Sequence, residues 1–244
     1  MRILLKISGE QLGYEQDGKG RGFDVERAKW LAGEIRQTLT DALNNGPTEI
    51  AIMVGGGNLV RGAFFDDAIK NNQIGQTTAD NAGMLATIIN ATLLGDIFRA
   101  EGVPTAVLSN VNVPQVVDDF TYRRAESHFK KGRVVILGGG TGRPLVTTDT
   151  GAVNLALELK CDLVAKATKV DGAYTDDPKV NPTAQKIDQI SYADAINDPK
   201  IRIMDKAALG MAGDHQLPIV IFELLQDGNI ARVAAGETIG TRVN

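Results

Sequence analysis

The chain has 244 residues, which is enough for one large α/β domain with a complete hydrophobic core. Hydrophobic residues make up 43% of it and charged residues 23%, a composition typical of an ordinary soluble globular protein. The formal net charge of -4 argues against a general nucleic-acid-binding protein, so any phosphate ligand has to be held by local cations.

Cysteine content and hydropathy exclude further classes of protein. The single cysteine, Cys161, rules out a disulfide framework or a multi-cysteine metal site within the chain. Apolar stretches fall short of the roughly 20 residues of a membrane span, and the first ten residues, MRILLKISGE, become charged too soon for a signal peptide. We therefore expect a cytoplasmic protein that has no membrane partner.

The first predicted strand covers residues 2–7, an apolar run broken only by Lys6. Lys6, Ser8 and Gly9 fall at its carboxyl end, where open α/β sheets place their ligands. Lys6 is either a solvated charge at the edge of the sheet or a phosphate contact. Its position at the strand end makes the phosphate contact at least as good an interpretation.

Residues 12–22 are predicted to form a flexible loop before a helix that Asp24 caps. The loop contains the pattern G-x-x-x-x-G-K, which ends at Lys19 and resembles a phosphate-binding P-loop. Gly20 stands where a P-loop has the serine or threonine that holds magnesium, and no helix follows directly. We therefore do not assign a P-loop to this segment.

The second strand, residues 49–54, runs directly into three glycines, Gly55, Gly56 and Gly57. Asp80 then opens a predicted helix that ends near Glu101. Asp80 is either a ligand-binding carboxylate or an acid favoured by the dipole at a helix start. The apolar side of this helix is expected in the core or at a subunit interface, and it consists of Met84, Leu85, Ile88, Ile89, Leu93 and Ile97.

A second strand with three glycines lies at residues 134–140, after a predicted strand at 105–108 and a short helix at 120–131. Glycines allow a phosphate to approach the backbone closely, although such a triplet can also be a simple tight turn. Threonine hydroxyls and the Arg143 guanidinium follow, and Asp149 is the expected N-cap of a helix over 150–159. Two glycine-rich strand ends in one sheet favour a crevice that binds two polyanions.

Neither glycine cluster fits the dinucleotide fingerprint G-x-G-x-x-G, because Val60 and Arg143 stand where its last glycine belongs. A Rossmann dehydrogenase is therefore disfavoured. His128 lies on a basic, polar helix, and His215 has no second histidine at metal-binding spacing, so we assign neither to chemistry.

A strand beginning near residue 162 leads into the loop 166–178, KATKVDGAYTDDP. Lys166 and Thr168 could hold the phosphates of a nucleotide and Tyr174 could flank its base, or the segment is a plain surface loop. A helix near Asp205, a strand at 219–222 and a closing segment at 238–243 complete the chain. Because strands alternate with helices, we expect an α/β fold with a mainly parallel sheet.

Five ordered motifs closely resemble the bacterial UMP kinases of the amino acid kinase superfamily. They are KISGE at 6–10, GGGNLVRG at 55–62, ADNAGMLAT at 79–87, TGRPLVTTD at 141–149 and KATKVDGAYTDDP at 166–178. The resemblance implies a three-layer α/β/α sandwich formed by one domain over 1–244, with UMP bound by about 1–150 and ATP by about 151–244. It also implies a magnesium-dependent transfer from ATP to UMP that yields UDP and ADP, and a homohexamer.

The resemblance also assigns roles to individual residues. Lys6, Asp149 and Lys166 are the implied catalytic residues, and Mg²⁺ is held mainly by phosphates rather than by protein ligands. The implied ATP-binding residues are Lys6, Ile7, Ser8, Gly9, Gly57, Arg61, Thr168, Tyr174 and Asp177. The implied UMP-binding residues are Gly56, Asp80, Thr141, Gly142, Arg143, Pro144, Leu145, Val146, Thr147 and Thr148.

The resemblance further implies GTP as an activator and UTP as an inhibitor, and two departures from the family pattern leave GTP activation open. The loop 12–22 is longer than usual, and Ala106 replaces an arginine that binds the effector in some members. One competing interpretation is a relative that phosphorylates a carboxylate, such as a glutamate or aspartate kinase. The other is a catalytically silent nucleotide-binding module, which would not need both lysines and Asp149.

Overall fold

The computed structural model describes residues 1–16, 19–45, 48–60, 65–176, 180–201 and 203–244. Nine strands form its main sheet: β1 (Arg2–Ile7), β4 (Glu49–Val54), β5 (Thr105–Ser109), β6 (Asp118–Asp119), β7 (Val134–Gly138), β8 (Leu163–Thr168), β11 (Gln189–Ile190), β12 (Ile219–Glu223) and β13 (Thr241–Val243). Their order is β11-β13-β12-β8-β1-β4-β7-β5-β6. All neighbours are parallel except β12 and β13, which confirms the mainly parallel sheet.

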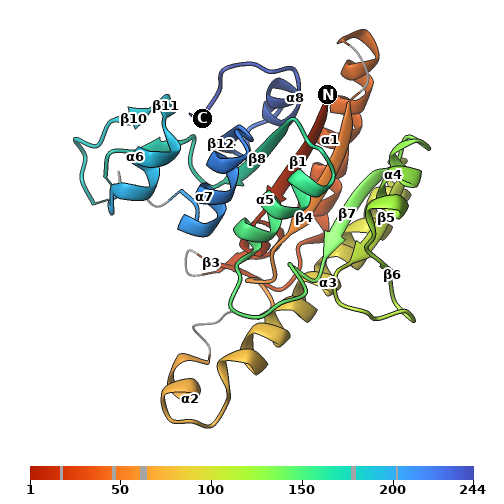
Figure 1. Cartoon of the computed structure of the whole chain (residues 1–244). Helices are drawn as coiled ribbons and strands as arrows, with labels where there is room; N and C mark the ends of the chain where they lie inside the picture. Colours follow the sequence, from red (N-terminus) through yellow and green to blue (C-terminus); the bar gives the residue numbers. More distant parts are fainter. Residues whose placement is uncertain (17–18, 46–47, 61–64, 177–179, 202) are drawn as a thin grey trace.

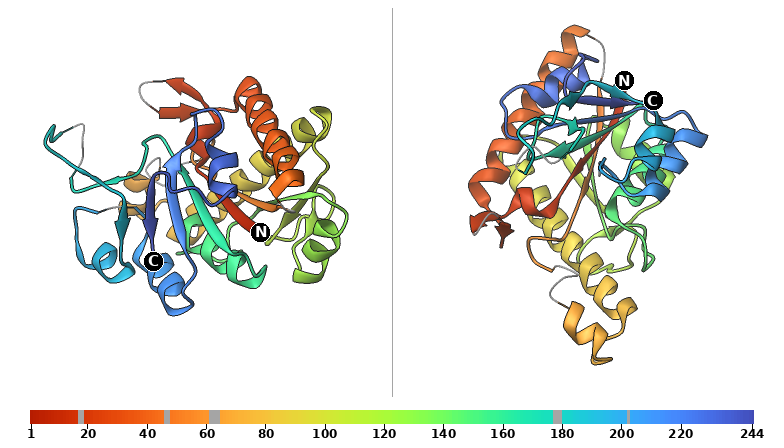
Figure 2. Two further views of the ribbon diagram at one scale, coloured as in Figure 1. Left: turned by 90° about the horizontal axis from the view of Figure 1, so that it is seen from above. Right: turned by 90° about the vertical axis from the view of Figure 1, so that its left-hand side faces the viewer.

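Helices cover both faces of this sheet, as Figure 2 shows. One face carries α1 (Val25–Asn45), α3 (Gln76–Ala100) and α8 (Asn229–Ala234). The other carries α4 (Tyr122–Phe129), α5 (Thr148–Glu158), α6 (Tyr192–Asn197) and α7 (Lys206–Asp214). Alternation along β1 supplies both cores, because Leu4 faces α5 while Ile3 and Leu5 face the opposite layer. The predicted three-layer sandwich is confirmed.

Strand β1 lies at the centre of the sheet and joins its two halves (Figure 1). On one side it pairs with β4, which leads to β7, β5 and β6 from the first part of the chain. On the other side it pairs with β8, which leads to β12, β13 and β11 from the second part. The carboxyl ends of β1, β4, β7 and β8 therefore share one edge, where the glycine-rich segments follow.

The predicted flexible loop at residues 12–22 is largely ordered. A 3₁₀ helix, η1 (Gly9–Leu12), leads into a hairpin of β2 (Tyr14–Gln16) and β3 (Lys19–Arg21). The hairpin packs closely on η1, because a Cβ added to Gly20 would lie 1.8 Å from the carbonyl oxygen of Glu10. The glycines that suggested flexibility thus allow close backbone packing instead.

Helix α3 begins at Gln76 after the N-cap Gly75, so the prediction that Asp80 opens this helix is wrong. The polar residues before Asp80 are already helical, so Asp80 lies beyond the first turn of α3 rather than at its start. Beyond Gly75, the short helix α2 (Asp66–Lys70) lies at the far end of the molecule (Figure 1).

Among the described residues, α3 alone is long and apolar enough to meet the length and composition criteria for a membrane span. This differs from the expectation that no apolar stretch approaches that length. Its residues Ala91, Leu94 and Phe98 are buried against the sheet, as in the core helix of a globular domain.

Two further strands form a small hairpin beside the main sheet. They are β9 (Ala173–Tyr174) and β10 (Lys186–Ile187), which pair with Tyr174 opposite Lys186. The hairpin follows β8 in the chain and is hydrogen-bonded to Thr241 at the start of β13.

Candidate active site

Two buried lysines meet one carboxylate at the centre of this edge. Lys6 on β1 lies directly opposite Lys166 on β8. The Lys6 Nζ lies 2.7 Å from Oδ1 of Asp149, and the Lys166 Nζ lies 2.6 Å from its Oδ2. The three side chains are only 8–15% exposed. Two cations share one anion, so the cluster carries a formal net charge of +1 and can attract a further anion.

Burial and charge act against each other on the pKa values of this cluster. Burial raises the pKa of the Asp149 carboxyl, but the ammonium groups of Lys6 and Lys166 together hold it below its usual range. Burial lowers the pKa of the Lys166 ammonium, and Asp149 offsets this only in part. Asp149 therefore remains ionised at neutral pH, as the counter-ion of both lysines.

The prediction that Asp149 is the N-cap of its helix is wrong. Helix α5 starts at Thr148, and the Thr147 hydroxyl accepts hydrogen bonds from the N–H groups of Asp149, at 3.1 Å, and Thr150, at 3.4 Å. Because Thr147 caps the helix, the Asp149 carboxylate is available for the lysines.

Asp205 supports this turn, and sequence reasoning gave it no site role. Its carboxylate accepts hydrogen bonds from the hydroxyls of Thr147, at 2.5 Å, and Thr150, at 2.8 Å. It also caps α7 by accepting from the N–H of Ala208. Burial raises its pKa, but these hydrogen bonds outweigh the effect and leave it below the usual value. The predicted helix start near Asp205 was the only signal for it.

Glycines at the ends of β1 and β4 allow the two backbones to touch. A Cβ added to Gly9 would lie 2.6 Å from the backbone nitrogen of Gly57 and 2.7 Å from the carbonyl oxygen of Gly55. A Cβ added to Gly56 would lie 2.7 Å from the Gly83 carbonyl oxygen on α3. A larger residue at either position would push these segments apart.

A buried pair of asparagines fixes the first glycine-rich turn to α3. The Asn90 Nδ2 donates to the carbonyl oxygen of Gly55 and to Asn58 Oδ1, each at 2.7 Å. Asn58 Nδ2 donates to Asn90 Oδ1 at 3.0 Å and to the Gly22 carbonyl oxygen, which ties in the β2–β3 hairpin. Sequence reasoning missed this pair, because Asn90 lies on a helix 32 residues from its partner.

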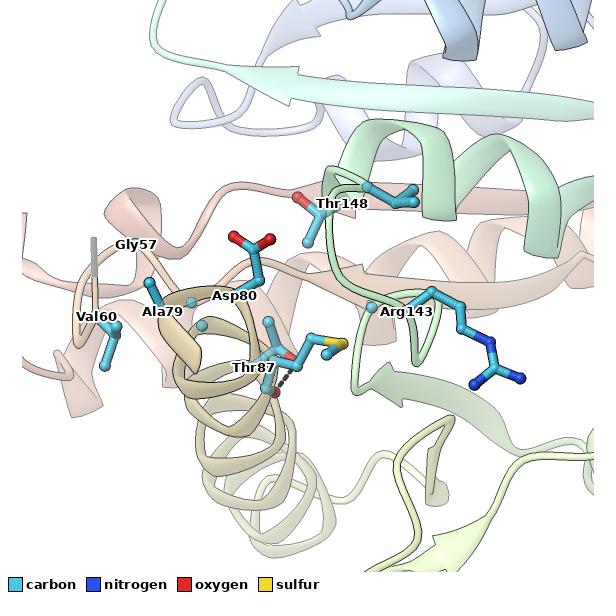
Figure 3. A pocket seen from close by; sticks show the side chains of 12 residues that line it. Gly57, Val60, Ala79, Asp80, Thr87, Arg143 and Thr148 are labelled. Carbon is cyan, nitrogen blue, oxygen red and sulfur yellow. Dashed lines mark hydrogen bonds between the residues drawn. The ribbon is translucent and has the colours of Figure 1, made fainter. Parts of the chain in front are cut away.

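A pocket lies between α3 and the segment 140–148 (Figure 3). Asp80 and Thr148 face this space, whereas the Arg143 side chain extends away from them. The Asp80 carboxylate accepts a hydrogen bond from the N–H of Leu145 at 2.8 Å and so fastens the segment to the helix. The lining residues are Gly56, Gly57, Val60, Ala79, Asp80, Gly83, Met84, Thr87, Gly140, Arg143, Val146 and Thr148.

The remaining predicted residues differ in how they relate to this pocket. Leu145 is 78% exposed, and it adopts a left-handed backbone conformation with φ of 65°. The Thr141 hydroxyl accepts from the backbone N–H of Arg143 at 3.2 Å and shapes the turn that also contains Gly142 and Pro144. The pocket thus receives predicted UMP-side residues from three segments, around Gly56, Asp80 and Thr148.

The predicted ATP-side residues come mainly from the segments that follow β1 and β8. Ser8 and Gly9 follow β1, and the Ser8 N–H donates to the Gln11 side chain, which shapes the start of η1. Thr168 ends β8, and the hydroxyl of Tyr174 donates to Asp171 at 2.6 Å. Ile7 is fully buried, so only its backbone can serve a ligand. The remaining predicted residues, Arg61 and Asp177, lie outside the described residues.

Comparisons with known proteins identify the family. The model of the amino acid kinase family matches residues 1–223. The chain is 39% identical to the uridylate kinase of Wolinella succinogenes over 97% of this chain and 93% of the relative.

Solved structures with the same fold include two bacterial UMP kinases. The UMP kinase of Bacillus anthracis has a TM-score of 0.88 at 34% identity and covers 100% of this chain and 95% of its own. The UMP kinase of Ureaplasma parvum has a TM-score of 0.87 at 28% identity, over 100% of this chain and 98% of its own. Together with the central lysine cluster and the predicted sandwich, these matches show that the chain belongs to the amino acid kinase family.

Proposed function

We propose that the chain is a UMP kinase that transfers the γ-phosphoryl group of ATP to UMP and yields UDP and ADP. The observation that carries this proposal is the cluster of Lys6, Lys166 and Asp149, which lies at the same edge of the sheet as the two glycine-rich strand ends and beside the α3 pocket. The names of the similar proteins support UMP as the acceptor and ATP as the donor.

The reaction needs positioning and charge neutralisation more than it needs a base. The second pKa of a phosphate monoester is about 6, so UMP is largely a dianion at neutral pH and attacks without losing a proton. We assign Lys6 and Lys166 to the phosphate oxygens on either side of the moving phosphoryl group. Asp149 acts as a positioning residue, because it holds both ammonium groups at one place.

The two nucleotides are assigned to opposite sides of this cluster. We place UMP in the pocket of Gly56, Asp80 and Thr148, and ATP along Ser8, Gly9, Gly57, Thr168 and Tyr174. Backbone N–H groups of glycine-rich turns suit phosphate oxygens, and carboxylates such as Asp80 suit ribose hydroxyls. The division into a UMP-binding part and an ATP-binding part remains a prediction.

Magnesium is proposed as the cofactor that neutralises the ATP phosphates. The described residues contain no group of three or more His, Cys, Asp or Glu that could hold a metal. Both Asp149 oxygens already contact lysines. The described side chains at this site therefore suit a Mg²⁺ ion that is held mainly by phosphate oxygens.

An acceptor survey tests the reaction. ADP release is measured in a coupled assay with UMP, CMP, dUMP or glutamate as acceptor, and the products are identified by chromatography. We expect UDP from UMP and no acyl phosphate trapped by hydroxylamine. Hydroxylamine trapping with glutamate, together with inactivity on UMP, would instead identify a carboxylate kinase. Nucleotide binding without turnover would identify a silent binding module.

Lysine variants test the site. Lys6→Met and Lys166→Met should each lower kcat by a factor of about 100 or more, because each removes a cation that stabilises the transition state. Removal of a single such group lowers kcat by a factor of about 10² to 10³. Lys29→Met is the control, because its ammonium pairs with Glu26 on the exposed face of α1. An unchanged kcat for Lys6→Met would remove Lys6 from the mechanism.

A homohexamer is the proposed assembly, and the outer face of α3 supports self-association. Leu85, Ile89 and Leu93 repeat every four residues and are 48%, 51% and 41% exposed. Such a stripe suits a second copy of the same helix. Ile89→Glu should reduce the mass measured by light scattering, whereas Glu101→Gln at the C-cap of the same helix should leave it unchanged. A monomeric wild type would overturn this assembly.

Regulation by GTP and UTP and a cytoplasmic location remain predictions. Ala106 is buried on β5, so this position offers no charge to an effector. Initial rates measured with added GTP and UTP, with substrate concentrations held fixed, test both effects.

A further inference from the structure

We propose that Thr241 is a positioning residue for ATP. From the last strand of the chain, its hydroxyl holds the segment 172–174 in the shape that receives the nucleotide. This inference rests on the proposed function, in which Thr168 and Tyr174 belong to the ATP side.

The Thr241 hydroxyl joins three elements that are far apart in the sequence. It accepts a hydrogen bond from the backbone N–H of Ala173 at 2.7 Å and donates one to the carbonyl oxygen of Ile187. Ala173 immediately precedes Tyr174 on β9, and Ile187 lies on the partner strand β10. One side chain of β13 thus fixes both strands of the hairpin.

Complete burial makes this contact strong. Thr241 is 0% exposed, and the Ala173 side of the bond is buried as well. A buried N–H that loses its partner costs about 1–3 kcal/mol, because no water replaces the lost bond. The Ala173 N–H therefore keeps this position only while the hydroxyl is present.

Two glycines let the backbone come close enough for this contact. A Cβ added to Gly172 would lie 2.7 Å from the Thr241 Oγ1, and Gly172 has a φ of 155°. A Cβ added to Gly240, which has a φ of 67°, would lie 1.9 Å from the carbonyl oxygen of Ile221. The turn that contains Gly172 and the chain at Gly240, just before β13, can therefore both pack closely beside Thr241.

Besides the backbone pairing of β9 with β10, the segment has a second side-chain attachment, which is exposed and therefore weak. Asp171 accepts from the Tyr174 hydroxyl and pairs with Lys186 at 3.1 Å, but the Asp171 and Lys186 side chains are 49% and 32% exposed. Ion pairs of this kind contribute about 0–1 kcal/mol. Thr241 is thus the buried side-chain attachment of this segment, and it ties the paired strands β9 and β10 to the main sheet. It lies beyond residue 223, where the family match ends.

The test compares isosteric and conservative variants of the full chain. Thr241→Val keeps the shape and removes the hydroxyl, and Thr241→Ser keeps the hydroxyl. Thr38→Val is the matched control, because that buried hydroxyl donates only to Glu34 within α1. KM for ATP, KM for UMP, kcat and the unfolding temperature are measured for each.

We expect Thr241→Val to raise KM for ATP on the order of tenfold, which corresponds to about 1.4 kcal/mol. KM for UMP and kcat should stay within about twofold, and Thr241→Ser should restore the wild-type KM for ATP. Gly172→Ala provides a second variant, which displaces the hydroxyl from the loop side and should raise the same KM. A lower unfolding temperature with an unchanged KM for ATP in both Thr241→Val and Gly172→Ala would overturn the inference.

Tyr174→Ala separates this inference from the proposed function. If it raises KM for ATP while Thr241→Val and Gly172→Ala do not, the positioning role fails and the ATP assignment stands. If none of these variants changes KM for ATP although UMP is phosphorylated, the assignment of this segment to ATP fails, and the positioning role fails with it.

Discussion

Replacement of Asp149 by Asn gives the sharpest test of the lysine cluster. The variant keeps the shape of the side chain but leaves Lys6 and Lys166 as neighbouring buried cations without their counter-ion. Removing one partner of a buried ion pair costs about 3–5 kcal/mol. At the low end, and with about 2–4 °C per kcal/mol for a chain of this size, the unfolding temperature should fall by about 6–12 °C at pH 7.

The pH dependence of this loss identifies its cause. The Asp149 pKa is lowered in the folded chain, so its contribution to stability is present above its usual pKa of about 3.9 and is lost as the pH falls through the folded value. In the variant, the repulsion between the ammonium groups of Lys6 and Lys166 is relieved when one of them loses its proton. The Lys166 pKa is already below its usual value, so the deficit should shrink as the pH rises from 7 toward 10.

Thermal unfolding followed by circular dichroism measures both effects without substrate. Asp96→Asn is the control, because the Asp96 side chain is 73% exposed in a surface pair with Arg99, and it should shift the unfolding temperature by less than about 2 °C. A shift of equal size for both variants, or a deficit at pH 7 that persists unchanged at pH 10, would refute the counter-ion role.

Gly9→Ala should lower kcat/KM on the order of tenfold or more, because its Cβ would overlap Gly55 and Gly57. The control Gly33→Ala on α1 meets nothing within 4 Å and should stabilise the chain by up to about 1 kcal/mol. Steady-state rates and urea unfolding are measured for both variants, and equal effects would contradict the packing argument. Asn90→Leu should lower the free energy of unfolding in urea by about 2 kcal/mol or more, since it leaves buried partners unpaired. A loss below about 0.5 kcal/mol, which is the size of a typical surface effect, would show that the asparagine pair is dispensable. Burial raises the Cys161 pKa to about 12, so the native thiol should resist alkylation at pH 8 and react after denaturation; rapid labelling of the native chain would contradict this burial.

The strand ends could be predicted from sequence because their signals are local. Apolar runs located β1 and β4 with the same bounds that the structure has, and three glycines marked the end of β4. Since parallel strands place their carboxyl ends along one edge, the predicted topology brought Lys6 and Lys166 to the same edge of the sheet, whereas the strand order that sets β1 beside β8 was not predicted. The predicted helix cap at Asp24 is also supported, because its carboxylate accepts from the Arg27 N–H at 3.0 Å.

The remaining features depend on contacts that no local pattern encodes. Thr147 and Asp149 are both good capping residues, and only the two distant lysines decide which of them caps α5. Asn90 looks like an ordinary polar helix residue until Asn58 is placed against it. The hairpin within 12–22 was missed because its glycines are typical of loops as well as of close backbone contacts.

The central place of β1 has a consequence for synthesis of the chain. This strand is translated about 160 residues before its neighbour β8. Until then, one edge of an apolar strand has no partner, and such edges invite association with other nascent chains. Chaperone capture should therefore concentrate on ribosome-bound intermediates that have not yet reached Leu163, and slow translation before that point should increase aggregation.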